Sequence, residues 1–240
     1  MIVSSIIGFV PAVLLLFILL RRYEEFFKES KIFQAFAAGM VIGMLFTAVH
    51  MAFDDQVLEF LDLSILGFVI LFPMFEQSTK LVILNYPKLQ LKHQTVYYGA
   101  AMGLGIGSMA IIAISYKFFL DFPEALGNPF QIMLFVILSF NYSLLHSATG
   151  IMIGYGSTKG YAMSWFYKAF LLHAAYNFTL LPLMWGMPGA IYGSLLVATM
   201  IAVLVFLYVL RDLMPEAIPP EMMRKRRRDH RKRIRNERSK

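Results

Sequence analysis

The hydrophobic residues of this chain fall into seven long blocks that are separated by short polar stretches. A helix needs about 20 mostly apolar residues to cross the hydrocarbon core of a bilayer, and each block has that length or more. The pattern therefore predicts an all-α fold, a polytopic membrane helix bundle with seven transmembrane helices. The predicted spans are residues 2–20, 32–53, 63–84, 95–116, 130–156, 162–181 and 189–210.

Basic residues in the polar stretches predict the orientation of the bundle. The stretches after the first, third and fifth spans contain Arg21, Arg22, Lys28, Lys31, Lys88, Lys92 and Lys159. The stretches after the second, fourth and sixth spans contain only Lys117, beside Asp54, Asp55, Glu59, Asp62, Asp121 and Glu124. Loops rich in Lys and Arg stay in the cytoplasm. We therefore expect the N-terminus outside and the C-terminus in the cytoplasm.

Composition agrees with a membrane protein and places the excess charge in one segment. The chain is 58% hydrophobic with a mean hydropathy of +0.63. Residues 211–240 hold 12 Lys or Arg and 5 Asp or Glu, whereas residues 1–210 hold 10 of each sign. The prediction is a transmembrane domain over 1–210 with an intramembrane polar site, and a basic cytoplasmic tail over 211–240. We expect this tail to contact anionic lipid headgroups, and we expect no nucleic-acid partner.

The third predicted span contains two ionisable residues one helical turn apart. An ionisable side chain in hydrocarbon costs about 2.5–3.5 kcal/mol on insertion scales, and such residues usually have a function. Glu76 and Lys80 are spaced i,i+4, which predicts that they share a face and partly neutralise each other. Pro73 removes a backbone donor, so we expect a bend near Glu76. An ion pair that only fixes helix packing is the alternative interpretation.

Two later spans carry histidine at a similar predicted depth. Tyr142 and His146 are spaced i,i+4 in the fifth span, as are His173 and Asn177 in the sixth. At 1.5 Å rise per residue, Glu76 and both histidines lie roughly 13–17 Å below the cytoplasmic face. A common depth predicts one polar cluster. Alternatively, each histidine and Asn177 could serve helix packing by hydrogen bonding.

These residue types suit hydrolysis without a covalent nucleophile. A buried carboxylate can take a proton from water, an imidazole can hold that water, and His with Asn can donate to an oxyanion. The chain has no Cys and no G-x-S-x-G serine, which disfavours nucleophilic routes. No cofactor is expected, but zinc is possible, with Glu76, His146 and His173 as its ligands.

Three motifs together resemble the PrsW group of intramembrane proteases, within the CAAX-prenyl-endopeptidase and bacteriocin-immunity superfamily. The motifs are Glu76-Gln77-Ser78-Thr79-Lys80, Tyr142-x-x-x-His146 and His173-x-x-x-Asn177, in the order of that superfamily. The glycine run at 103–107 is similar to the glycine-rich segment of PrsW proteins, and the resemblance covers about residues 63–181. The chain departs from the pattern at Gln77, where the superfamily has a second Glu, and at Ala110-Ile111, where PrsW proteins carry Glu-Asn.

The resemblance implies a role for each motif residue. Glu76 would activate water with His146, while His173 and Asn177 would form the oxyanion hole. Gln77, Lys80 and Tyr142 would support them. The implied activity is a glutamate-dependent endopeptidase that acts on a membrane-associated protein substrate, and we expect it in a prokaryotic cell membrane.

Two other functions stay open at this point. The seven-span subunit of γ-secretase belongs to the same superfamily and is a scaffold without proteolysis of its own, which makes a catalytically inactive scaffold with a membrane-protein partner one alternative. A proton-coupled transporter that uses Glu76 and the histidines as a relay is the other.

Overall fold

The computed structural model describes residues 1–57, 67–184, 189–226 and 228, and these residues form helices and short connections without a strand. The α-helices are α1 (Ile2–Arg21), α2 (Glu29–Val57), α4 (Phe72–Leu84), α5 (Thr95–Asp121), α6 (Pro129–Lys159), α7 (Ala162–Met184), α8 (Ile191–Tyr208) and α9 (Met214–Ala217). Two short 3-10 helices, η1 (Glu24–Phe26) and η3 (Pro123–Gly127), and two π-helical turns, η2 (Gly67–Leu71) and η4 (Val209–Leu213), complete them. The all-α prediction is confirmed for the described residues.

Six of the helical segments are long and apolar enough to cross a membrane, which makes this an integral membrane protein. They are Ile2–Arg21, Glu29–Met51, Gly67–Leu84, Thr95–Asp121, Pro129–Lys159 and Ile191–Ala217. The predicted span at 162–181 lies in α7, which is 23 residues long but is not among the six. Polar residues on α7, including His173 and Asn177, lower its hydropathy. The first four residues of the predicted span at 63–84 lie outside the described part of the chain.

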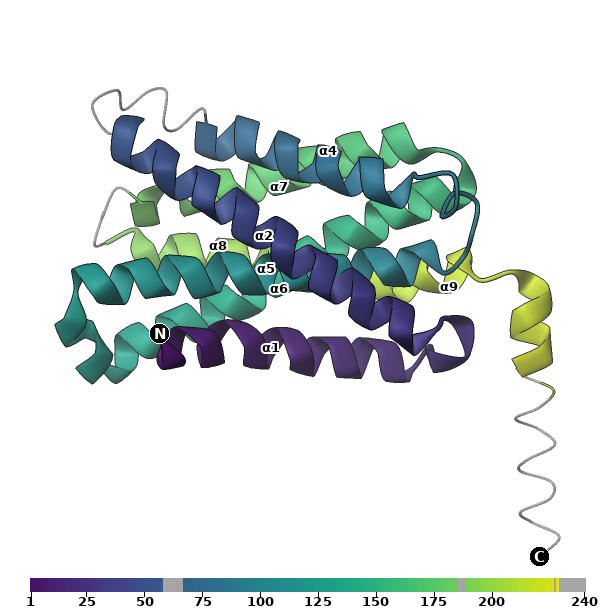
Figure 1. The fold of residues 1–240 in the computed structure, drawn as a ribbon, viewed down its shortest axis with the longest axis horizontal. Coiled ribbons are helices and arrows are strands. Elements are labelled where there is room, and N and C mark those ends of the chain that lie inside the picture. The colour runs from purple at the N-terminus through teal and green to yellow at the C-terminus, as the bar shows by residue number, and fades with distance from the viewer. Residues whose placement is uncertain (58–66, 185–188, 227, 229–240) are drawn as a thin grey trace, which may run out of the picture.

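Helices α5 and α6 form the centre of the bundle (Figure 1). α1 and α2 pack on α5, whereas α4, α7 and α8 pack on α6. The connections from α1 to α2, from α4 to α5 and from α6 to α7 lie at the end of the bundle where α9 lies, and the connection from α5 to α6 lies at the opposite end (Figure 1). The basic connections are therefore gathered at one end.

Glycines set the distance between the central helices. A Cβ added to Gly103 of α5 would collide with the carbonyl oxygen of His146 on α6, and Gly99 and Gly150 would collide with each other's carbonyl oxygens. Gly39 of α2 lies in the same way against α5. Small residues at four-residue spacing allow such close approach. Gly189 and Gly193 have the same four-residue spacing, but they make no such contact, because an added Cβ would meet nothing within 4 Å at either position.

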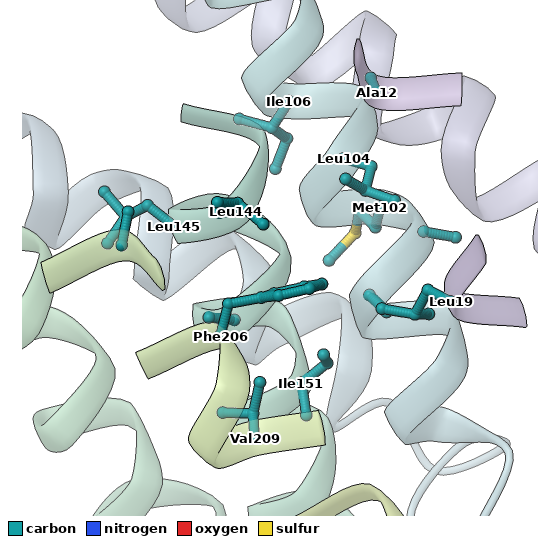
Figure 2. Packing of buried hydrophobic residues seen from close by; sticks show 14 of the residues in the cluster. Ala12, Leu19, Met102, Leu104, Ile106, Leu144, Leu145, Ile151, Phe206 and Val209 are labelled. Atoms are coloured by element: carbon teal, nitrogen blue, oxygen red, sulfur yellow. The ribbon is translucent and has the colours of Figure 1, made fainter. Parts of the chain in front are cut away.

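Apolar side chains from four helices and η4 meet in one core. Leu19 of α1, Met102 of α5, Ile151 of α6 and Phe206 of α8 converge there, and the Phe206 ring points between α5 and α6 (Figure 2). Buried Met214 and Ile218 extend this core into the first part of the segment predicted as the tail. Its next residues, 220–226, are helical and dock on the α1–α2 turn, where Arg226 donates to the Arg22 carbonyl oxygen at 3.0 Å.

Candidate functional site

Glu76 lies one turn into α4, directly after a widened turn of the chain. Gly67–Leu71 form the π-helical η2, and Pro73 occupies the first turn of α4. Proline lacks the backbone N–H that a continuing α-helix would use, which accounts for the irregular turn directly before Pro73. π-Turns are rare and frequently occur at functional sites.

The carboxylate of Glu76 faces both intramembrane histidines. Its Oε2 lies 3.6 Å from Nδ1 of His146 and 3.5 Å from Nδ1 of His173. The two imidazole rings meet edge to face, with centroids 4.9 Å apart. Both histidine side chains are at most 3% exposed, whereas that of Glu76 is 14% exposed. The common depth predicted for these three residues thus corresponds to direct contact between α4, α6 and α7.

Lys80 is completely buried, and it does not form the direct ion pair with Glu76 that was the alternative interpretation of the sequence. Its Nζ donates to Thr149 Oγ1 at 2.7 Å and to the His146 carbonyl oxygen at 3.4 Å, and lies 3.3 Å from His146 Nδ1. No Glu76 oxygen lies within ion-pair distance of it among the described contacts. The reason is that α6 offers two oxygens to this ammonium group, so the lysine turns toward α6. Lys80 and Glu76 contact the same imidazole ring instead of each other.

Two buried amides hold the α7 side of the site. Gln77 Nε2 lies 2.8 Å from His173 Nδ1. Asn177 Nδ2 donates to the carbonyl oxygen of Phe68 in η2 at 2.9 Å, and its Oδ1 has no hydrogen-bond partner. Because an amide nitrogen carries two hydrogens, Asn177 keeps a second N–H that Phe68 does not use. Gln77 thus lies beside His173, and Asn177 lies one helical turn from His173, as their i,i+4 spacing predicts.

Tyr142 completes the predicted set through its ring. The ring stacks on His146 with centroids 5.9 Å apart and meets Tyr176 edge to face at the same distance. The stack on His146 helps to fix the orientation of its imidazole ring. All seven residues singled out from the sequence therefore belong to one cluster.

A small cavity adjoins the cluster. Its volume is about 40 Å³, room for one or two water molecules. Glu76, His173 and Asn177 reach it from two helices, and Tyr142 reaches it from a third. The full lining is Phe46, Thr47, His50, Phe68, Phe72, Glu76, Ala110, Ile114, Tyr142, His173 and Asn177. The cavity therefore brings a carboxylate, an imidazole and an amide together at one point.

Sequence reasoning missed three residues at this site. His50 of α2 lines the cavity and stacks on Phe68, with ring centroids 5.6 Å apart. Phe68 also supplies the carbonyl oxygen for Asn177, and Thr149 holds Lys80. The i,i+3 pair of Thr47 and His50 on an otherwise apolar face was the one available signal for His50. Nothing in the residue spacing indicates the roles of Phe68 and Thr149.

Glu76, His146 and His173 could hold a metal ion, because one ligand atom from each lies within 4.8 Å of the others. Two histidines, one carboxylate and a water molecule form a ligand set typical of catalytic zinc. The ammonium group of Lys80, 3.3 Å from His146 Nδ1, would repel a cation bound at that nitrogen. The donor types fit zinc, whereas the neighbouring charge opposes it.

No family model, no curated protein and no solved structure matches the chain.

Proposed function

We propose that this protein is a glutamate-dependent intramembrane endopeptidase of the PrsW type, which hydrolyses a membrane-associated protein. One observation carries the proposal: a single carboxylate oxygen of Glu76 faces two buried histidines beside a cavity that can hold water. In this proposal α7 also crosses the membrane, which brings the number of crossings to seven. The N-terminus is outside, and the basic end faces the cytoplasm of a prokaryotic cell, where the tail contacts anionic lipid.

The first chemical step is the activation of water. A water molecule in the cavity donates one hydrogen bond to Glu76, and His146 orients the carboxylate from the other side. Glu76 takes a proton from this water molecule while the water oxygen attacks the peptide carbonyl carbon. A C–O bond forms, and the carbonyl π electrons move onto the carbonyl oxygen.

The second step is the collapse of the tetrahedral intermediate. The unused N–H of Asn177 and an N–H of His173 donate to the oxyanion, as hydrogen-bond donors do in other hydrolases. The C–N bond then breaks, and Glu76 returns its proton to the leaving amine nitrogen. The products are a carboxylic acid and an amine, and Glu76 is again a carboxylate.

The supporting residues keep these groups in place. Gln77 contacts His173 Nδ1 at 2.8 Å, and Lys80 with Thr149 holds the backbone of His146. Tyr142 stacks on the His146 ring. Gln77, Lys80 and Thr149 are fully buried and Tyr142 is partly buried, so the geometry does not depend on exposed surface side chains.

We propose that the reaction needs no metal, because the ammonium group of Lys80 lies 3.3 Å from His146 Nδ1, one of the atoms that would bind the ion. Cleavage should therefore survive treatment with a strong zinc chelator. Loss of cleavage in the chelator, with recovery on adding zinc, would overturn this: Glu76, His146 and His173 would then hold a zinc ion that activates the water.

The decisive experiment compares membranes that contain the wild-type protein with membranes that contain Glu76→Gln, by mass spectrometry of newly formed protein termini. The amide keeps the shape of the side chain but cannot take the proton. Expression and thermal unfolding midpoint are first shown to be equal. Termini that appear only with the wild type would identify the substrate and support Glu76 as the base; identical termini would end the protease proposal.

A cavity of about 40 Å³ favours one second candidate, an inactive scaffold, because a peptide needs far more space than one or two water molecules. A scaffold should copurify with one membrane protein, and Glu76→Gln should leave that complex intact. A protease should release its products and show no such stable partner.

A further inference from the structure

An apolar groove lies between α1 and α2, far along the chain from the residues of the polar site. Both helices pack on α5 and make few contacts with each other, and they diverge from their shared turn (Figure 1). The groove has a volume of about 320 Å³ beside that turn. Leu16, Leu20 and Ile32 form its buried floor, and Val13 and Phe33 form exposed walls. This volume lies in the range of small-molecule sites.

The rim of the groove carries charges of both signs. Arg21 at the end of α1, Glu24 in η1 and Glu29 at the start of α2 line it, and all three side chains are exposed. Within the described part of the chain, none of the three forms an ion pair. The Arg21 guanidinium lies over the Phe17 ring, 5.9 Å from its centroid, which keeps it at the groove. One cation and two carboxylates thus stand at the mouth of an apolar groove, and none of the three has a described ion-pair partner.

We propose that this groove binds a phospholipid with an ethanolamine headgroup. One acyl chain would lie along the apolar floor, the phosphate would pair with Arg21, and the primary ammonium would donate to Glu24 and Glu29. The groove matches a lipid in polarity, because its floor is apolar and its charged residues lie at the helix ends, where lipid headgroups lie.

The rim charges select among the common headgroups. A purely anionic headgroup would pair with Arg21 but would meet two carboxylates that repel it. A choline headgroup carries both charges, but its quaternary ammonium has no N–H to donate to Glu24 and Glu29. Of the ethanolamine, choline and glycerol headgroups, only ethanolamine satisfies both signs with hydrogen bonds. This inference does not depend on the proposed proteolysis, because none of the groove residues belongs to the polar site.

The test is native mass spectrometry of the full-length protein in detergent, titrated with dioleoyl phospholipids that bear ethanolamine, choline or glycerol headgroups. We expect one ethanolamine lipid to be retained about five-fold more tightly than the other two, the ratio that one additional charge contact at a membrane surface gives. Equal retention of all three lipids, or tightest retention of the glycerol lipid, would overturn the proposal, as would a dimer that excludes lipid from this face.

Two variants with matched controls locate the site. Val13→Trp should fill the groove and abolish the retained lipid, whereas Val10→Trp should not, because both valines are exposed on α1 and only Val13 lines the groove. The double change Glu24→Gln and Glu29→Gln should remove the ethanolamine preference, while Glu124→Gln in η3 should preserve it. Since these glutamates are exposed, their substitution leaves the fold intact, and an unchanged preference would refute the assignment even if Val13→Trp fails to fold.

Discussion

Helix α6 contacts its neighbours in two different ways. On one side α5 meets it backbone to backbone, with Gly103 against the His146 carbonyl oxygen and Gly99 against Gly150. On the other side α4 and α7 meet it through polar side chains, including Lys80 with Thr149 and Glu76 with His146. The same residue, His146, takes part in both contacts: its carbonyl oxygen meets Gly103 and also accepts from Lys80, and its ring lies in the polar cluster.

The difference separates two kinds of dependence. The α5–α6 contact depends on the absence of side-chain volume, so any added carbon should disturb it whatever its chemistry. The contact with α4 and α7 depends on donors and acceptors, so a change of a few atoms at constant shape should alter its chemistry while the bundle remains folded. Substitutions on the two sides should therefore affect different measurements.

The largest effect is expected at the glycine contact. Gly103→Val should lower the free energy of unfolding by at least about 3 kcal/mol, because the new side chain meets backbone that cannot rotate away. The thermal unfolding midpoint of the detergent-solubilised protein measures this. Gly193→Val is the control, since Gly193 faces open space and should change the midpoint little. Equal midpoints for the two variants would show that the close approach of α5 and α6 is not required.

A large loss of activity with a modest loss of stability is expected at Asn177. Asn177→Leu keeps the approximate volume, removes the proposed oxyanion donor, and removes the side-chain hydrogen bond to the Phe68 carbonyl oxygen. Cleavage should fall about 100-fold, the usual effect of losing one such donor. The unfolding free energy should fall by about 1–3 kcal/mol.

The same substitution at Asn141 is a matched control for this prediction. Asn141 is buried on α6 and donates to Thr199 Oγ1 at 2.8 Å, away from the cavity. Asn141→Leu should lose similar stability and keep its rate of cleavage. If both variants lose activity in proportion to stability, Asn177 is a packing residue and not an oxyanion donor.

The sequence predicted the polar side of α6 more fully than its surroundings. Spacing of i,i+4 placed Tyr142 with His146 and His173 with Asn177, and depth along the spans placed Glu76 beside them, because helical rise and period are fixed. These are properties of single helices. Their contact could be expected from residues whose burial in a membrane is costly unless they meet one another.

What the sequence could not predict depends on how helices rotate against each other. The spacing left open whether Lys80 pairs directly with Glu76 on its own helix. Lys80 turns to Thr149 instead, because the choice depends on which face of α6 lies opposite. His50 reaches the cavity for the same reason: the rotation of α2 on α5 is set by the packing of Gly39 and its neighbours, which residue spacing does not encode.

A moderate effect is expected at Lys80. Lys80→Met keeps the length of the side chain, and Thr149 Oγ1 still donates to the His146 carbonyl oxygen at 3.1 Å. Replacing a buried charge by an apolar group of similar volume is often neutral for stability, so the unfolding free energy should change by less than about 1 kcal/mol. Cleavage should fall about ten-fold, because His146 loses the group that holds it. Lys117→Met, at an exposed lysine, should change neither quantity; a Lys80→Met protein with the full rate of cleavage would limit Lys80 to packing.

The smallest effect is expected for Tyr142→Phe, because the Tyr142 ring contacts the site and its hydroxyl makes no hydrogen bond among the described contacts. Tyr142→Phe keeps the stack on His146 and the edge contact with Tyr176, so cleavage should stay within about three-fold of wild type. Tyr142→Ala removes both ring contacts and should lower cleavage about ten-fold and the unfolding free energy by about 3 kcal/mol. The ratio of the two rates separates shape from chemistry at one position: if Tyr142→Phe loses as much activity as Tyr142→Ala, the hydroxyl takes part in the reaction, and the polar side of α6 contains one more working group than the geometry assigns.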